Sequence, residues 1–378
     1  MRYIKKLEDI PQLSDAERAA LKPVADAYAF RVSEYYLGLI DWNDPADPIR
    51  QLVIPRTDEL NDWGKLDASN EAANTVMRGV QHKYPDTALL LCNEVCGAYC
   101  RYCFRKRLFM NDNDEASKDL REGIEYIAAH PEITNVLLTG GDPLLLSTRR
   151  LTEVIEALRQ IEHVRIIRIG TKMTAFNPWR VLDDPALLEM FAKYSTPHKR
   201  IYVMNHFDHP RELTDAAVEG LDKLIRAGAI MTNQCPMIAG INDDPAVLSD
   251  MFRQLSWIGC PPYYLFQGRP TAGNDPYKVP IVRGWEIFRE ALRHGAGLAR
   301  RARFVMSHET GKVEVLAVDD KHIYLRYHRA KDASLRGRFL IYRRDDEACW
   351  LDDLVPAEGS DAPRFAPDGL LETGQGPE

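Results

Sequence analysis

Between residues 88 and 300 the chain alternates short apolar runs with longer amphipathic stretches, and this alternation limits the possible folds more than any other feature. Repeated strand-helix units have right-handed crossovers and parallel strands. Six such units predict an α/β fold built on a partial (β/α)6 barrel that is open on one side. The predicted strands are 89–91, 135–138, 165–169, 200–204, 230–233 and 263–266, and the predicted helices are 117–129, 151–160, 185–193, 214–226 and 244–258.

The sequence on either side of this repeat has a different character. Residues 1–80 are charged and helical in pattern, and Ser14 with Glu17 fits a capping box at a helix start. After residue 300 a period of two predicts a small β-rich extension. We therefore expect an N-terminal helical region at 1–80, the barrel at 81–300, the extension at 301–354 and a disordered tail at 355–378, which is rich in Pro, Gly and acidic residues.

Three cysteines directly follow the first predicted strand, at Cys96, Cys100 and Cys103. Their C-x3-C-x2-C spacing can supply three ligands to a [4Fe-4S] cluster, which normally has four cysteines, and so leaves one iron free. Such an iron can bind S-adenosylmethionine (SAM), whose reductive cleavage releases a 5′-deoxyadenosyl radical. A disulfide would leave one thiol unpaired. A zinc ion would need a fourth ligand, and His82 is the one histidine near enough in sequence.

Polar residues at the ends of the later strands are candidate SAM ligands, because barrels of this kind carry their chemistry at the carboxyl ends of the strands. After the second strand come Gly140, Gly141 and Asp142, where the backbone can approach a ligand closely and its carbonyls can accept from an amino group. Side chains that suit the ribose and carboxylate of SAM follow the next three strands. They are Arg168, His206 and Gln234.

Composition argues against two other kinds of partner. The net charge is -7, and basic residues are interspersed with acids rather than gathered on one face, so no nucleic acid partner is expected. No apolar run approaches the roughly 20 residues of a membrane span, so no membrane is expected either. Reduced thiols and an oxygen-sensitive cluster favour the cytoplasm.

Further motifs extend beyond the cysteine loop. They are YYLGLIDWNDPADPIR at 35–50, HKYPD at 82–86, YCRYCFRKR at 99–107, HFDHP at 206–210, GIND at 240–243 and PYY at 262–264. With the cysteine triad, these motifs resemble the lysine 2,3-aminomutase family of the radical SAM superfamily over about residues 30–330. The resemblance implies that the substrate binds as an imine of pyridoxal 5′-phosphate (PLP), that the radical removes a β-hydrogen, and that the nitrogen then migrates.

The resemblance also assigns residues to PLP. It places the Schiff-base lysine at Lys312, and it places Lys83 and Tyr84 among the cofactor-binding positions. Two departures weaken the match: HETG stands at 308–311 where the family has several glycines, and Thr87 stands where the family has an arginine. Residues 309–312 can also be interpreted as an ordinary hairpin turn with an exposed lysine.

Substrate choice follows from charge. Lysine-specific members of the family bind the distal ammonium with aspartates, but this chain has Arg269 and Val305 at those positions. Arg269 favours a carboxylate, which predicts an acidic amino acid such as glutamate, although an arginine in a loop can also be merely solvated. Arg105 matches a family position that contacts the substrate α-carboxylate, so Arg105 and Lys312 are the predicted catalytic residues.

The sequence thus predicts a radical SAM aminomutase that acts on a small amino acid other than lysine. It would take electrons from a partner such as flavodoxin or ferredoxin, and it would form a homo-oligomer to which residues 35–50 contribute. Two alternatives stay open. One is a PLP-independent radical SAM enzyme acting on another small molecule or on a protein side chain, and the other is a non-enzymatic iron–sulfur redox protein.

Overall fold

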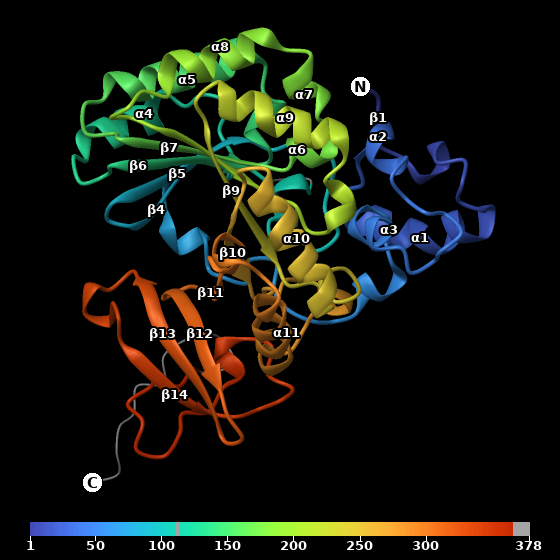
Figure 1. Ribbon diagram of the computed structural model, residues 1–378, viewed down its shortest axis with the longest axis vertical. Helices are drawn as coiled ribbons and strands as arrows, with labels where there is room; N and C mark the ends of the chain where they lie inside the picture. The colour runs from blue at the N-terminus through green and yellow to red at the C-terminus, as the bar shows by residue number, and fades with distance from the viewer. Residues whose placement is uncertain (111–112, 366–378) are drawn as a thin grey trace.

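The computed structural model describes residues 1–110 and 113–365, and its central feature is one twelve-stranded sheet (Figure 1). Strands β5 to β11 pair in parallel in chain order, and β3 and β14 are the edge strands. The six predicted strands correspond to β5–β10, so the open α/β barrel is confirmed. The strands of the barrel are β5 (Thr87–Asn93), β6 (Asn135–Gly140), β7 (Ile166–Thr171), β8 (Ile201–Asn205), β9 (Ile230–Pro236) and β10 (Pro262–Phe266).

Helices between the strands cover the outer face of the barrel (Figure 1). Alternation along each strand decides which side chains meet them: on β7, Ile167 and Ile169 are buried in the main core, while Arg168 points to the opposite, inner face. The helices of this layer are α4 (Arg121–Ala129), α5 (Thr148–Gln160), α6 (Met173–Phe176), α7 (Trp179–Leu182), α8 (Pro185–Tyr194), α9 (Asp215–Arg226), α10 (Pro245–Trp257) and α11 (Ile281–Arg293).

The C-terminal strands continue the barrel sheet. β11 (Arg303–His308) is parallel to β10, and β12 (Gly311–Val318), β13 (His322–Ala330) and β14 (Phe339–Arg343) then follow antiparallel. Part of the segment predicted to be disordered is packed: the Arg343 N–H donates to the Val355 carbonyl at 2.8 Å, and the Phe365 ring lies 4.8 Å from that of His308. The rest of the predicted tail, 366–378, lies outside the described residues.

The N-terminal region forms a second, smaller core beside the barrel (Figure 1). Ser14 and Glu17 make the predicted capping box, with the Glu17 N–H donating to Ser14 Oγ at 3.2 Å. At the end of the region predicted to be helical, two strands join the sheet instead. Its elements are β1 (Tyr3–Ile4), α1 (Asp15–Ala27), β2 (Val32–Ser33), α2 (Glu34–Leu37), α3 (Pro48–Val53), β3 (Thr75–Met77) and β4 (Val80–Tyr84).

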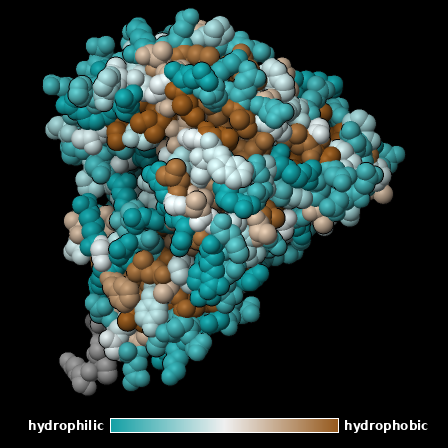
Figure 2. Space-filling view, in the orientation of Figure 1, coloured by the Kyte–Doolittle hydropathy of each residue, from teal (hydrophilic) through white to brown (hydrophobic). Residues whose placement is uncertain are grey.

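Hydrophilic side chains cover most of the face shown in Figure 2, and hydrophobic ones gather over the helical layer of the barrel. Within residues 1–110 and 113–365, no helix has both the length and the apolar character that crossing a bilayer requires.

Candidate active site

The three cysteines lie in the loop that follows β5, at the carboxyl end of the barrel. Cys96, Cys100 and Cys103 are free thiols, neither fully buried nor exposed. Burial raises the pKa of Cys96, and the nearby Asp142 carboxylate and the other two thiols raise it further. Because each thiol acts electrostatically on Cys96, the three share one space at the end of the barrel.

Charges around the thiols fit an anionic iron–sulfur cluster. Against the effect of burial, the ammonium of Lys172 lowers the pKa of Cys100, and Lys106 and Arg105 lower that of Cys103. In the described part of the chain, no group of three or more His, Cys, Asp or Glu side chains is arranged to hold a single metal ion. Three thiols with cations beside them are the donor set that three irons of a cluster require.

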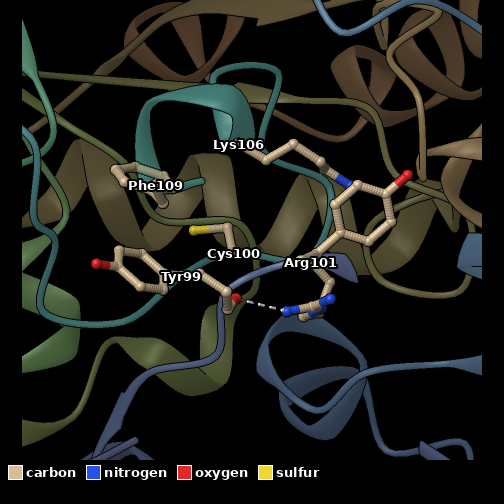
Figure 3. Close-up of a pocket in the computed structure, with 7 residues that line it drawn as sticks. Tyr99, Cys100, Arg101, Lys106 and Phe109 are labelled. Atoms are coloured by element: carbon tan, nitrogen blue, oxygen red, sulfur yellow. Dashed lines mark hydrogen bonds between the residues drawn. The ribbon is translucent and has the colours of Figure 1, made fainter. Parts of the chain in front are cut away.

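The N-terminal region holds the cysteine loop from outside. Arg101, between two of the cysteines, forms a fully buried ion pair with Glu59 at 2.7 Å and donates to the Ala29 carbonyl at 3.1 Å. Beside it, the Lys106 ammonium lies 4.5 Å from the ring centre of Tyr28 and has no hydrogen-bond partner. Burial lowers the pKa of Lys106 to about 8. A small cavity lies between these side chains, and Tyr99, Cys100 and Phe109 also line it (Figure 3).

Gly140 and Gly141 pack closely against the backbone at the start of the cysteine loop. Gly140 has a φ of +106°, and a Cβ there would lie 2.5 Å from the Asn93 carbonyl oxygen. A Cβ on Gly141 would lie 2.5 Å from the backbone of Val95. Only glycine permits this contact between the end of β6 and the cysteine loop.

The Asp142 side chain is already engaged within the protein. Its carboxylate accepts from the Thr171 hydroxyl at 2.8 Å, from the Lys172 N–H at 2.8 Å and from the Leu144 N–H at 3.0 Å. Burial nevertheless raises the pKa of Asp142 to about 6. Its backbone is engaged as well: the Asp142 N–H donates to the Val95 carbonyl at 2.9 Å, and its carbonyl accepts from the Asn93 side-chain amide at 2.8 Å. Asp142 therefore joins the ends of β6 and β7 to the cysteine loop rather than offering a free group to a ligand.

His206 belongs to a buried polar network beneath the cysteine loop. Its Nε2 lies 3.0 Å from the Tyr102 hydroxyl and 3.0 Å from the Asp208 carboxylate. The Lys172 ammonium pairs with Asp208 and with Glu212, each at 2.6 Å. The network connects the ends of β7 and β8 with the cysteine loop, since Tyr102 lies between Cys100 and Cys103 in sequence.

The family-like segment 35–50 contacts the same network. The Tyr36 hydroxyl donates to Glu212 at 2.6 Å, and the Tyr35 hydroxyl lies 2.6 Å from Thr214 Oγ1. Asp47 pairs with Arg211. These contacts within one chain support the loop after β8, which explains why this motif accompanies the barrel motifs.

Gln234 and Arg168 both point to the inner face of the barrel, but they lie at different positions along their strands. Gln234 lies near the carboxyl end of β9 and has no hydrogen-bond partner among the described residues, so its amide can meet a ligand. β7 continues to Thr171, so Arg168 lies within the strand, and its Nε donates at 2.8 Å to Asn135, the first residue of β6. The prediction that Arg168 stands on the carboxyl rim is wrong.

Lys312 lies inside the barrel rather than in an exposed turn. It is the second residue of β12, and its ammonium lies 4.5 Å from the ring centre of Phe266 and 4.9 Å from that of Tyr264. It has no hydrogen-bond partner in the described part of the chain. Burial, together with the charges of Arg269 and Lys83, holds the pKa of Lys312 well below 10.5. The alternative of an exposed hairpin lysine is wrong.

Lys83 and Tyr84 line the same space from β4. Lys83 donates to the His308 carbonyl, and burial together with Arg269 lowers its pKa to about 7. The Tyr84 hydroxyl is buried without a hydrogen-bond partner, and burial raises its pKa to about 12. A buried donor without an acceptor identifies a position that a ligand can satisfy.

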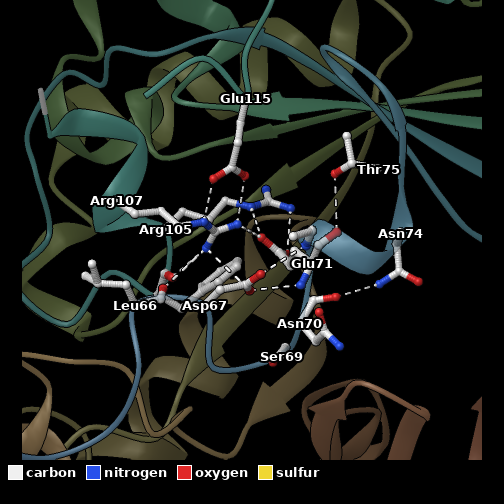
Figure 4. Close-up of polar contacts among 12 residues, drawn as sticks. Leu66, Asp67, Ser69, Asn70, Glu71, Asn74, Thr75, Arg105, Arg107 and Glu115 are labelled. Atoms are coloured by element: carbon white, nitrogen blue, oxygen red, sulfur yellow. Dashed lines mark hydrogen bonds and ion pairs between the residues drawn. The ribbon is translucent and has the colours of Figure 1, made fainter. Parts of the chain in front are cut away.

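Arg105 and Arg269 converge on the buried carboxylate of Glu71, and Figure 4 shows Arg105 and Arg107 beside it. Arg105 donates to both of its oxygens, at 3.0 and 3.1 Å, and Arg107 contacts it at 2.8 Å. Arg269 approaches Glu71 at 3.5 Å, and its guanidinium stacks 3.8 Å from the ring centre of Phe104. Although burial opposes ionisation, the arginines hold the pKa of Glu71 well below 4.5. Arg269 is thus buried beside Arg105 rather than solvated.

Three residues of this site escaped the sequence reasoning. Lys172 directly follows β7, and its charge at the carboxyl end of a barrel strand is a signal that could have identified it. Glu71 lies outside the regular helices and strands, in a segment with no helix or strand periodicity in its sequence. Arg329 of β13 reaches the barrel interior, and its guanidinium lies 4.1 Å from the ring centre of Tyr84.

Comparisons with known proteins agree with this geometry. Residues 91–250 match the Radical SAM superfamily model. A putative L-lysine 2,3-aminomutase of Aquifex aeolicus is 54% identical over 354 residues, which cover 93% of this chain and 95% of that protein. An L-lysine 2,3-aminomutase of Fusobacterium nucleatum is 34% identical, covering 79% and 70%. A glutamate 2,3-aminomutase of Clostridioides difficile is 33% identical, covering 78% and 69%.

Proposed function

Because the chain belongs to the lysine 2,3-aminomutase family of the radical SAM superfamily, we propose that it is a PLP-dependent amino acid 2,3-aminomutase acting on an acidic amino acid. Membership of the superfamily implies a [4Fe-4S] cluster and SAM. The observation that carries the finer proposal is Lys312, an amine of strongly lowered pKa that faces aromatic rings inside the barrel and has cations around it. Such a lysine suits covalent attachment of a pyridoxal cofactor.

The groups that bind the cluster and SAM lie at the carboxyl end of the barrel. Cys96, Cys100 and Cys103 hold three irons at the carboxyl end, while Gln234 and the backbone of Gly140 offer polar groups to SAM. When bound, the cluster and SAM supply a radical, and PLP supplies a conjugated ring that can stabilise a radical while nitrogen migrates.

Lys312 suits the role of nucleophile because burial and the nearby charges of Arg269 and Lys83 lower the pKa of its amine well below 10.5, which favours the unprotonated form. Lys83, whose pKa falls to about 7, is next to it and can donate or accept a proton near neutral pH.

Substrate specificity rests on two of the three arginines that share Glu71. Arg105 and Arg269 bring two positive charges to one carboxylate, and Nε and Nη2 of Arg269 have no hydrogen-bond partner in the described part of the chain. These donors can bind a second carboxylate in bidentate fashion. We therefore assign the α-carboxylate of the substrate to Arg105 and its side-chain carboxylate to Arg269. The glutamate 2,3-aminomutase among the relatives is named for such a substrate.

The proposal is tested with anaerobically reconstituted protein, SAM, PLP and a low-potential donor such as flavodoxin or ferredoxin. Amino acids are screened for 5′-deoxyadenosine release and for the β-amino product. Borohydride trapping of PLP followed by peptide mass spectrometry locates the attachment site, and Lys312→Ala should lose both the attachment and the product. Substrate-dependent SAM cleavage without PLP attachment would favour the PLP-independent alternative, and no SAM cleavage at all would favour a redox protein.

A further inference from the structure

A guanidinium occupies the place of the arginine that this chain lacks at position 87. Arg329 Nη2 lies 3.3 Å from Thr87 Oγ1, and the same nitrogen donates to the Asp86 carboxylate. Arg329 comes from β13, far along the chain, and its guanidinium covers the Tyr84 ring at 4.1 Å. Thr87 begins β5, so this guanidinium lies at the amino end of the barrel.

Strand pairing directs Arg329 toward the candidate cofactor lysine. Lys312 and Arg329 face each other in the β12–β13 ladder, and residues opposite each other in such a ladder project from the same side of the sheet. Gly311 makes this approach possible, because a Cβ there would lie 2.2 Å from the Arg329 carbonyl oxygen. The one glycine kept before Lys312 therefore brings β13 close to it.

Arg168 adds a second guanidinium at the same end. Only its Nε is engaged, with Asn135, and only Nη2 of Arg329 is engaged. The remaining guanidinium nitrogens of both residues have no hydrogen-bond partner among the described residues. The charges of both arginines also lower the pKa of Lys312, so the three groups act on one space. Asp86, the acidic partner of Arg329, is 62% exposed, so solvent screens its charge.

Two guanidinium groups with free donors form a site for a phosphate dianion. Resting on the proposed function, we propose that Arg329 and Arg168 bind the PLP phosphate, with Arg329 placing a positive charge from β13 beside Thr87, where the family resemblance places an arginine. This arrangement also accounts for the missing glycines at 308–310. Side-chain donors replace the backbone donors that a glycine-rich turn would offer.

The test compares PLP with pyridoxal, which has the same aldehyde but no phosphate. Both are titrated into apo protein and followed by visible absorbance. Arg329→Gln should weaken PLP binding by about tenfold to a hundredfold, the loss of one charged hydrogen-bonding group, and should leave pyridoxal binding unchanged. Thr87→Arg added to Arg329→Gln should restore PLP affinity. The matched control is Arg326→Gln on the same strand, where the arginine pairs with Glu314 at 2.7 Å, and it should bind PLP as the wild type does.

The outcomes separate this inference from the proposed function. Equal PLP affinity in wild type and Arg329→Gln would overturn the inference while PLP dependence survives. Equal weakening of PLP and pyridoxal would also overturn it, because the arginine would then only maintain the fold. Wild-type protein that binds neither compound would overturn the proposed function together with the inference.

Discussion

Replacing Glu71 should lower the free energy of unfolding, because three arginines lose their shared buried partner. Its carboxylate is the shared partner of Arg105, Arg107 and Arg269, with contacts from 2.8 to 3.5 Å. Removing one member of a buried ion pair costs about 3 to 5 kcal/mol, because the remaining charge stays desolvated. Glu71→Gln keeps the volume and one acceptor oxygen, so we expect the lower end, about 3 kcal/mol of unfolding free energy.

Urea unfolding of cofactor-free protein measures this loss. Glu153→Gln is the control, since Glu153 makes exposed ion pairs on α5 and should cost at most about 1 kcal/mol. A loss for Glu71→Gln no larger than that of the control would refute the reasoning.

The pH dependence of the unfolding free energy provides a second test of the role of Glu71. The arginines hold the pKa of Glu71 below its ordinary 4.5, so its contribution to stability is present above about pH 4.5 and is lost as the pH falls below that value. The Glu71→Gln variant should lack this component. An unchanged difference between the two proteins from pH 7 down to the acid range would contradict the assignment.

Three further predictions concern the cofactors and the assembly. Cys96→Ala, Cys100→Ala and Cys103→Ala should each lose the cluster and SAM cleavage after anaerobic reconstitution, because two thiolates are too few; full iron content with SAM cleavage in any variant would count against the triad. Arg269→Ala should weaken binding of the acidic substrate by roughly 2 to 5 kcal/mol, whereas efficient turnover of free lysine would place specificity elsewhere. The protein should be at least a dimer by light scattering, and an active monomer would exclude this.

The sequence was informative where a feature is local. The strand-helix alternation located all six barrel strands, and the cysteine spacing located the loop after β5, because both patterns depend on near neighbours. Arg168 was misplaced because it was assigned to the strand end although it already lies inside the predicted strand 165–169, and the strand itself extends to Thr171. Strand ends depend on the partners that pair with them, and these are not visible in a short window.

Long-range charge pairing was beyond the sequence. Glu71 meets Arg269 across 198 positions, and Arg329 meets Thr87 across 242. Neither contact has a sequence period, since a buried charge needs only an opposite charge or a donor nearby in space. The departure at Thr87 was visible, but its compensation by Arg329 required the β12–β13 register.

The most direct test of the central claim follows one hydrogen atom. Glutamate carrying deuterium at C3 is incubated with reconstituted protein, SAM, PLP and reductant, and both 5′-deoxyadenosine and β-glutamate are analysed by mass spectrometry. The account predicts deuterium in 5′-deoxyadenosine and formation of β-glutamate, with the product absent when PLP is omitted and in Lys312→Ala. Deuterium-free 5′-deoxyadenosine with no β-amino product from glutamate, aspartate or any other amino acid tested would contradict it.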